Sequence, residues 1–196
     1  MLNRSAGKAP VKLSPETYGL LKRSIGYSVL TAGLFDVTVG PLMDLWDFAH
    51  ASCAPAEEDI ASAPSPVGFR DLLLDGAKRT AMLGGQGQGI DLGGIGKGYA
   101  GVCGMEALRK NGIRSAAFSI GGNVSVLGAK PDGTPWSVGV RHPRNHGLLL
   151  GTLFAKGKSI VTSGITNVSF STGKGDGIII SSTLARATTR IRGWSA

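Results

Sequence analysis

The chain has 196 residues, of which 42% are hydrophobic and 17% charged, and its net charge is +8. This length and composition suit one hydrophobic core of ordinary domain size and exclude a disordered chain or a coiled coil. The basic residues are scattered, and no helix-turn-helix, zinc-finger or aromatic RNA-binding pattern accompanies them, so nucleic acid is not a predicted partner. A basic surface can equally attract an anionic dinucleotide.

Two kinds of apolar segment are missing from this sequence. No apolar run approaches the roughly 20 residues of a membrane span, and the first residues do not form a signal peptide. Cys53 and Cys103 stand far apart without a CxxC spacing, which indicates neither a metal site nor redox chemistry.

The first half of the chain alternates helix and strand signals. Ser14, Pro15 and Glu16 predict the start of a helix that ends at Gly33. Residues 49–68 predict a surface connection around one short helix. Residues 72–74 and 80–83 predict a hairpin, and a later strand ends at Asp91.

The second half continues in the same mixed order. A helix is predicted over residues 97–111 and a buried strand over residues 116–120. Residues 124–127 and 136–141 predict a hairpin, with further strands at residues 148–154 and 159–162. We therefore predict an α+β fold, a single layered domain of mixed, largely antiparallel sheet with helices. Residues 13–164 should form one compact body, with these side chains largely buried: Phe35, Trp46, Ile95, Phe118 and Val138.

Residues 90–100, IDLGGIGKGYA, carry the strongest local signal of chemistry. An apolar strand end delivers Asp91, a Gly-Gly turn follows, and Lys97 opens the next helix. Glycines let a ligand approach the backbone, and the amides at a helix start attract phosphate. The pattern predicts a phosphate or metal site; the alternative is a plain strand-to-helix turn with a buried Asp.

Four more blocks occur in order with this run: residues 33–42, GLFDVTVGPL; residues 119–124, SIGGNV; residues 136–143, WSVGVRHP; and residues 161–164, VTSG. The series resembles the FAD:protein FMN transferase family over residues 13–164. The resemblance implies the family's α+β fold and transfer of FMN from FAD to a Thr or Ser hydroxyl of an acceptor flavoprotein, with release of AMP. It also implies FAD as substrate and Mg²⁺ as cofactor.

The resemblance carries specific roles onto this sequence. Leu34, Phe35 and Asp36 fall on a segment that contacts FAD, where Leu replaces the usual Ala. Asp91 falls on a second FAD contact, and Lys97 faces the flavin nucleotide. Three alternatives remain open: Asp36 caps a turn, and Arg141 and His142 are polar surface residues.

Gly94 falls on the position that ligates Mg²⁺, through its carbonyl oxygen. The catalytic residues are expected in a later part of the family sequence and are not assigned here. The implied partner is an acceptor protein with an Asp-Gly-x-Ser/Thr-Gly-Ala-Thr motif, such as a redox-pump subunit. Family members are often exported to the outer face of the inner membrane and begin earlier than Met1, so we expect a late start and leave localisation open.

Residues 165–196 lack the later family blocks, which include a His that contacts FAD and the Mg²⁺ carboxylate. Back-translation of this tail, read from the third base of each codon, permits Tyr-Glu-Arg-Phe-Phe-Phe-Asp-Gly-Lys-Arg. The same frame further along permits His-His-His-Ile-Ile-Asp-Pro-Arg-Thr-Gly. We therefore predict an incomplete transferase domain over residues 1–164 and an out-of-frame tail over residues 165–196.

A frameshift leaves the activity of this polypeptide open. The first hypothesis is an FAD:protein FMN transferase that is impaired in this form. The alternatives are a non-catalytic protein that holds FAD without cleaving it, and an unstable fragment with uncovered sheet edges.

Overall fold

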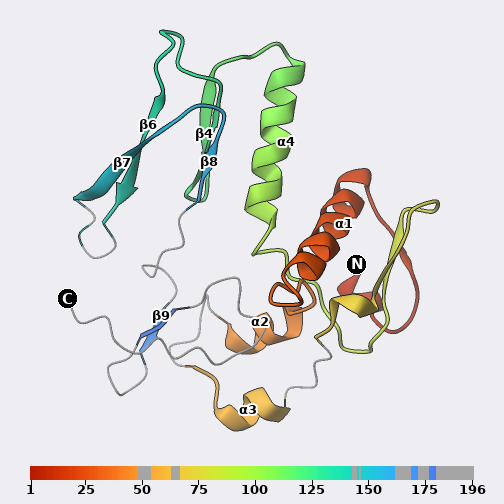
Figure 1. The fold of residues 1–196 in the computed structure, drawn as a ribbon. Coiled ribbons are helices and arrows are strands. Elements are labelled where there is room, and N and C mark those ends of the chain that lie inside the picture. The colour runs from red at the N-terminus through yellow and green to blue at the C-terminus, as the bar shows by residue number, and fades with distance from the viewer. Residues whose placement is uncertain are drawn as a thin grey trace. The chain divides into compact units, whose positions relative to one another are not determined.

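A computed structural model describes residues 1–47, 54–62, 67–142, 145, 147–161, 169–171 and 177–179. These residues group into two compact units (Figure 1). Unit 1 holds residues 1–94 with two short strands from the end of the chain, and unit 2 begins at Ile95. We had expected one compact body over residues 13–164, and the chain instead changes unit within the glycine-rich run, directly after Gly94.

Unit 1 is a three-stranded antiparallel sheet with helices. Its strand order is β1–β3–β2, from strands β1 (Val11–Lys12), β2 (Leu72–Asp75) and β3 (Thr80–Leu83). Strand β2 follows the 3-10 helix η2 (Phe69–Asp71), and another 3-10 helix, η1 (Asn3–Ser5), precedes β1. The core of this unit contains the buried side chains of Leu21, Val37, Phe69, Leu72, Ala81 and Leu83.

Helix α1 (Pro15–Leu30) begins where the sequence predicted. The Ser14 hydroxyl accepts a hydrogen bond from the backbone N–H of Thr17 at 3.2 Å, and Pro15 occupies the first turn. Ser24 and Ser28 are fully buried, and each hydroxyl donates to the carbonyl four residues earlier. The buried stripe of α1 therefore consists of Leu21 and two serines, and the serine hydroxyls are satisfied within the helix.

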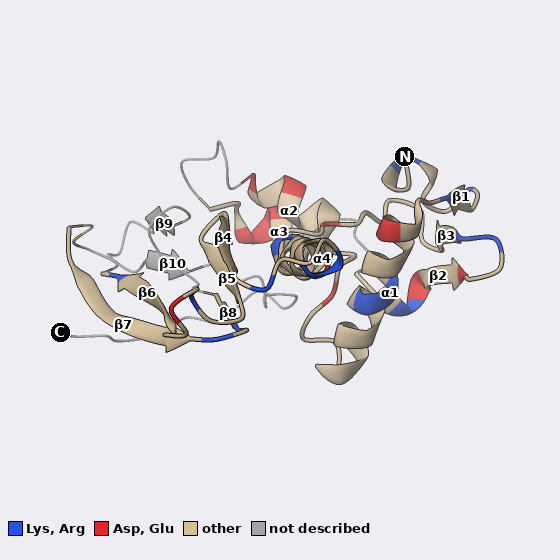
Figure 2. Ribbon diagram, turned by 90° about the horizontal axis from the view of Figure 1, so that it is seen from above, with Lys and Arg blue, Asp and Glu red and all other residues tan. Residues whose placement is uncertain are grey.

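Two shorter helices belong to the same unit. Helix α2 (Gly40–Trp46) was not predicted, although Pro41 in its first turn is a known start signal. Helix α3 (Glu57–Ser62) lies in the predicted surface connection and has three acidic residues in its first turn, marked red in Figure 2. Negative charge at a helix N-terminus is favourable because it faces the positive end of the helix dipole.

Unit 2 contains helix α4 (Gly96–Lys110) and two antiparallel sheets. One sheet has the order β4–β5–β8, from β4 (Ala116–Ile120), β5 (Asn123–Leu127) and β8 (Ser159–Ile160). The other is the hairpin of β6 (Trp136–Arg141) and β7 (Leu149–Ala155). Met105 of α4 and Val126 and Leu127 of β5 are buried.

The predicted hairpin between residues 124–127 and 136–141 is wrong. Strand β5 pairs with β4 and β8, and β6 pairs with β7. Gly121 and Gly122 both have positive φ, which suits a two-residue turn joining antiparallel strands. The turn around Pro131 closes locally instead, because Lys130 N–H donates to the Thr134 carbonyl at 2.9 Å.

The predicted fold class is confirmed in its main terms, because antiparallel sheets and helices follow one another in mixed order. The five side chains expected to be largely buried lie between the buried and the exposed residues, and none of them is fully enclosed (Phe35, Trp46, Ile95, Phe118 and Val138). Small units have a large surface relative to their volume, so few large side chains are fully enclosed.

Cys103 is an exposed free thiol on α4, while Cys53 lies outside the described residues. None of the described helices combines the length and apolar character needed to cross a bilayer. From residue 165 onward the structure describes only strands β9 (Ser169–Ser171) and β10 (Gly177–Ile179), which pair antiparallel.

Candidate functional site

The segment after α1 displays the first predicted ligand-contacting residues. The chain turns at Ala32 and Gly33, which both have positive φ. The Thr31 hydroxyl accepts a hydrogen bond from the backbone N–H of Phe35 at 3.0 Å. Leu34 is 60% exposed. The Phe35 ring meets Tyr27 edge to face, with ring centroids 6.5 Å apart. An apolar side chain and an aromatic ring are therefore held at the surface of unit 1.

Asp36 is buried, and protein donors occupy both of its carboxylate oxygens. One oxygen accepts from the N–H and the hydroxyl of Thr38 at 2.8 and 2.7 Å, and the other accepts from Phe69 N–H at 2.8 Å. The Thr38 hydroxyl also accepts from Gly68 N–H at 2.8 Å. Asp36 thus joins the segment after α1 to the start of η2, which is the turn-capping role that the sequence left open. Its predicted contact with FAD stays a prediction.

The second predicted segment lies directly beside the first. Val39 and Gly89 form a parallel β-bridge. Gly40 N–H donates to the Gly89 carbonyl at 3.0 Å, and Asp91 N–H donates to the Val37 carbonyl at 2.8 Å. The backbone of Asp91 is therefore fixed against the segment that carries Leu34, Phe35 and Asp36, although the two are far apart in the sequence.

The side chains of Asn3 and Gln88 hold the backbone that leads to Asp91. The Asn3 side chain accepts from Ile90 N–H at 2.9 Å and donates to the Ile90 carbonyl at 3.1 Å. The buried Gln88 amide accepts from Gly85 N–H at 2.9 Å and donates to Asp71 at 3.1 Å. Sequence reasoning missed these supports, because no local pattern connects residues so distant in the chain.

The close approach of the Gly89 backbone leaves no room for a side chain at Gly40. A Cβ built on Gly40 would lie 2.8 Å from the carbonyl carbon and oxygen of Gly89. We expect Gly40→Ala to lower the free energy of unfolding by about 1–3 kcal/mol, because overpacking against backbone cannot relax easily. Urea unfolding would measure this change.

Gly26→Ala is the matched control, since nothing lies within 4 Å of its Cβ position in α1. That substitution should stabilise the protein by about 0.5–1 kcal/mol through helix propensity. Equal destabilisation by both substitutions, or none by Gly40→Ala, would contradict the close approach of the two segments.

The end of unit 1 is an exposed glycine turn. One Asp91 oxygen accepts from Gly93 N–H at 2.8 Å, and Asp91 itself is only partly buried. Gly93 and Gly94 are exposed. The turn leaves the second carboxylate oxygen of Asp91 and the Gly94 carbonyl as acceptors that a ligand can approach.

The predicted Lys97 lies in unit 2, in the first turn of α4. It is exposed, and no side chain caps the start of this helix. A Cβ on Gly121 would lie 3.0 Å from Lys97 Cε and 3.3 Å from its Nζ. The ammonium group therefore lies close to the Gly121–Gly122 turn, which brings together two of the blocks noted in the sequence.

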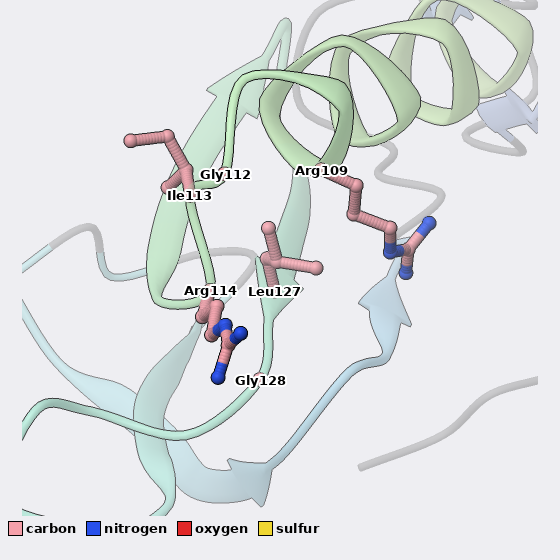
Figure 3. A pocket seen from close by; sticks show the side chains of 6 residues that line it. All are labelled: Arg109, Gly112, Ile113, Arg114, Leu127 and Gly128. Atoms are coloured by element: carbon pink, nitrogen blue, oxygen red, sulfur yellow. The ribbon is translucent and has the colours of Figure 1, made fainter.

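One cavity among the described residues lies at the other end of α4 and contains none of the predicted site residues. It has a volume of about 370 Å³ and is lined by Arg109, Gly112, Ile113, Arg114, Leu127 and Gly128 (Figure 3). Arg109 is in the last turn of α4, where positive charge offsets the negative end of the helix dipole. Helix stabilisation accounts for this arginine without a ligand.

Comparison with known proteins identifies the architecture. A model of the ApbE family matches residues 1–192. The chain belongs to the ApbE family. The matched range runs past Gly164 and so includes most of the tail that the sequence predicted to be out of frame.

Relatives of this ApbE-family chain include FAD:protein FMN transferases from two bacteria. That of Klebsiella pneumoniae is 30% identical over 165 residues, covering 83% of this chain and 50% of the relative. That of Treponema pallidum is 30% identical over 178 residues, covering 83% and 49%. The chain spans about half the length of these curated relatives.

Solved ApbE structures share the fold. The ApbE protein of Thermotoga maritima gives a TM-score of 0.78 at 31% identity, covering 90% of this chain and 57% of its own. The flavin transferase ApbE of Vibrio cholerae gives 0.64 at 30% identity, covering 72% and 46%. The predicted α+β class and the predicted family are both confirmed.

The implied Mg²⁺ is not accommodated by the described part of this ApbE-family chain. Among the described residues, no group of three or more His, Cys, Asp or Glu side chains could hold a metal ion. Gly94 offers at most one backbone carbonyl, whereas Mg²⁺ prefers octahedral oxygen coordination with carboxylate ligands.

Arg141 and His142, whose role the sequence left open, lie where β6 ends and the chain turns toward β7. The His142 ring accepts from Asn145 N–H at 3.0 Å, and His142 N–H donates to the Leu148 carbonyl at 3.0 Å. Arg141 is exposed at the end of β6. Both residues therefore belong to the connection between β6 and β7.

Proposed function

We propose that this ApbE-family protein is an FAD:protein FMN transferase that moves FMN from FAD to a Thr or Ser hydroxyl of an acceptor flavoprotein. The main support is the backbone pairing of Val37–Gly40 with Gly89–Asp91. The two segments that resemble FAD contacts are distant in sequence and adjacent in space, as one ligand site requires.

The proposed reaction balances as a phosphoryl transfer. The acceptor hydroxyl oxygen forms a bond to the phosphorus of the FMN half, and the bond from that phosphorus to the bridging pyrophosphate oxygen breaks. AMP leaves with the bridging oxygen, and the hydroxyl proton passes to a base or to solvent. Catalysis of this chemistry consists mainly of positioning and charge stabilisation.

The described residues supply binding and positioning. The exposed Leu34 and the partly exposed Phe35 offer apolar surface for the flavin or adenine ring. Asp91 offers a carboxylate oxygen to ligand hydroxyl or N–H donors, and Lys97 offers positive charge to phosphate. Asp36 holds the segment after α1 in place and does not offer its oxygens to a ligand, because both accept hydrogen bonds from Thr38 and Phe69.

The family resemblance and the Gly94 carbonyl are what support Mg²⁺ as the cofactor. Mg²⁺ supplies charge neutralisation on a pyrophosphate when bound. Activity assays should therefore contain Mg²⁺, with a chelator as the comparison.

Binding of FAD tests the placement of Asp91. In the protein with its reading frame restored after Gly164, Asp91→Ala should weaken FAD binding about tenfold or more, because a hydrogen bond to a charged group contributes about 1.5–3 kcal/mol. Isothermal titration would measure the affinity. Asp91→Asn keeps an acceptor for Gly93 N–H and separates loss of charge from loss of the turn.

Asp75→Ala provides a matched control in unit 1. Asp75 accepts from Lys78 N–H at 3.0 Å at the tip of the β2–β3 hairpin and has no proposed ligand role. Its substitution should leave FAD affinity unchanged. Unchanged affinity in Asp91→Ala as well would remove Asp91 from the proposed site.

We also propose that transferase activity is impaired in the chain that ends with residues 165–196 as its tail. The support is that synonymous codons for residues 165–196 permit, in a shifted frame, sequences that resemble the family blocks in the expected order. A protein that binds FAD without cleaving it is the competing function. Release of AMP distinguishes the two, because only the transferase breaks the pyrophosphate.

A further inference from the structure

The side chain of Asn3 bonds to both backbone polar groups of a single residue, Ile90. Its oxygen accepts from Ile90 N–H at 2.9 Å, and its amide nitrogen donates to the Ile90 carbonyl at 3.1 Å. In an antiparallel sheet, two residues that lie opposite each other exchange the same pair of bonds through their backbones. The Asn3 side chain therefore does for Ile90 what a residue of a neighbouring strand would do.

The other edge of this segment is bonded to the chain after α1. The Gly89 carbonyl and the Asp91 N–H form the two backbone bonds described above, and Ile90, between them, bonds only to Asn3. Bonds that alternate between two edges along successive residues are the pattern of a central strand. The segment that leads to Asp91 is thus held by a backbone on one edge and by a side chain on the other.

The N-terminal segment is itself anchored, which fixes the position of Asn3. Ala6 is buried, and Gly7 N–H donates to the Leu83 carbonyl of β3 at 2.8 Å. A Cβ on Gly7, whose φ is +70°, would lie 2.9 Å from backbone atoms of Gln86. Asn3 is therefore carried by a segment that packs closely on β3 and on the turn that follows it.

The bonds of Asn3 lie at the surface, which separates positioning from stability. Because Asn3 is exposed, water can replace its amide at the Ile90 N–H and carbonyl, and folding stability then changes little. Water holds no fixed position, however, so loss of the amide frees the segment without unfolding it. One Asp91 oxygen is bonded to Gly93 N–H, and the direction of the second oxygen depends on this backbone.

We propose that Asn3 is a positioning residue of the dinucleotide site and that it acts through Asp91. Asn3 holds the backbone of Ile90 so that the second carboxylate oxygen of Asp91 faces the ligand before the ligand arrives. Binding then requires less ordering of the protein, which raises affinity. The inference rests on the proposed function only in placing FAD beside Asp91, and it requires no transfer of FMN.

A double-mutant cycle tests whether Asn3 acts through Asp91. Isothermal titration measures FAD affinity of the full 196-residue chain and of its Asn3→Ala, Asp91→Ala and doubly substituted forms. We expect Asn3→Ala to weaken binding about five- to tenfold, because the ligand must then order the segment. In the Asp91→Ala background, the same substitution should change affinity by less than about twofold.

Ser14→Ala is the matched control for a loss of stability. It removes the hydroxyl cap of α1 in the same unit and leaves residues 89–91 untouched, so FAD affinity should not change. Amide hydrogen exchange without FAD supplies a second measurement. The amide of Ile90 should exchange faster in Asn3→Ala than in wild type, and at the wild-type rate in Ser14→Ala. Circular dichroism confirms that both variants fold.

Three results would overturn the inference and leave the proposed function intact. One is unchanged FAD affinity in Asn3→Ala beside a clear loss in Asp91→Ala. Another is an equal effect of Asn3→Ala in both backgrounds, which would show that Asn3 acts independently of Asp91. The third is an equal loss of affinity in Ser14→Ala. Wild-type affinity in Asp91→Ala, or no binding of FAD by the full chain, would instead refute the ligand placement on which the inference rests.

Discussion

With FAD, Mg²⁺ and an acceptor protein carrying the Asp-Gly-x-Ser/Thr-Gly-Ala-Thr motif, the frame-restored protein is expected to release AMP and to leave flavin covalently bound to the acceptor. The chain as printed should be slower by at least about a hundredfold, the usual cost of losing one group that stabilises a transition state. Flavin fluorescence of the denatured acceptor on a gel measures the transfer, and AMP is measured by chromatography.

An acceptor in which the target Thr or Ser is replaced by Ala controls for non-covalent flavin. A chelator in place of Mg²⁺ tests the metal requirement. Equal labelling by the two forms of the protein would refute the functional consequence of the frameshift. Binding of FAD by the frame-restored protein without AMP release would favour the non-catalytic binder instead.

The second large effect concerns stability. Asp36→Ala should lower the free energy of unfolding by about 3 kcal/mol, because it leaves the buried N–H groups of Thr38 and Phe69 without their acceptor. Urea unfolding followed by tryptophan fluorescence measures the loss. The same substitution should reduce FAD affinity only to the extent that it disorders the segment after α1.

The chain offers a close control for this substitution. Asp132 has the same Asp-x-Thr spacing and accepts from the N–H and hydroxyl of Thr134 at 2.9 and 2.6 Å, but in an exposed turn. Asp132→Ala should have a clearly smaller effect than Asp36→Ala. A comparable loss in the two variants would show that burial and the bond to Phe69 contribute little.

The exposed Asp132 turn should respond to acid. Hydrogen bonds from Thr134, that of its hydroxyl first, lower the pKa of Asp132 from its ordinary value. A lowered folded-state pKa gives a contribution to stability that is present above the unfolded-state pKa and disappears as the pH falls through the folded-state pKa. Because Asp132 is exposed, solvent screening keeps this contribution small.

Local signals in the sequence predicted most secondary elements well. Helix α1 begins beside its Ser14 cap as expected, and β4 and the β2–β3 hairpin lie where predicted. These elements depend on caps, turns and periodicity within a few residues, all of which a sequence displays. The pairing of β5 was missed because the choice between two glycine-containing turns is decided by backbone conformation at Gly121 and Gly122.

The candidate site was predictable in its residues but not in its construction. The positions of Leu34, Phe35 and Asp91 follow from ordered motifs, and the structure brings their segments together. The sequence could not show that both carboxylate oxygens of Asp36 accept hydrogen bonds from Thr38 and Phe69, because Phe69 is remote in the chain. A buried carboxylate and an exposed one look alike until their partners are known.

The contact between Val39 and Gly89 has a consequence for how ligands affect folding. Few backbone hydrogen bonds close a long loop there, and loop closure carries an entropic cost that those bonds must offset. A ligand that touches both segments binds only after closure, so it shifts the equilibrium toward the closed state by mass action. The melting temperature of this protein should therefore report on occupancy, and dinucleotides that span both segments should raise it further than either half-molecule alone.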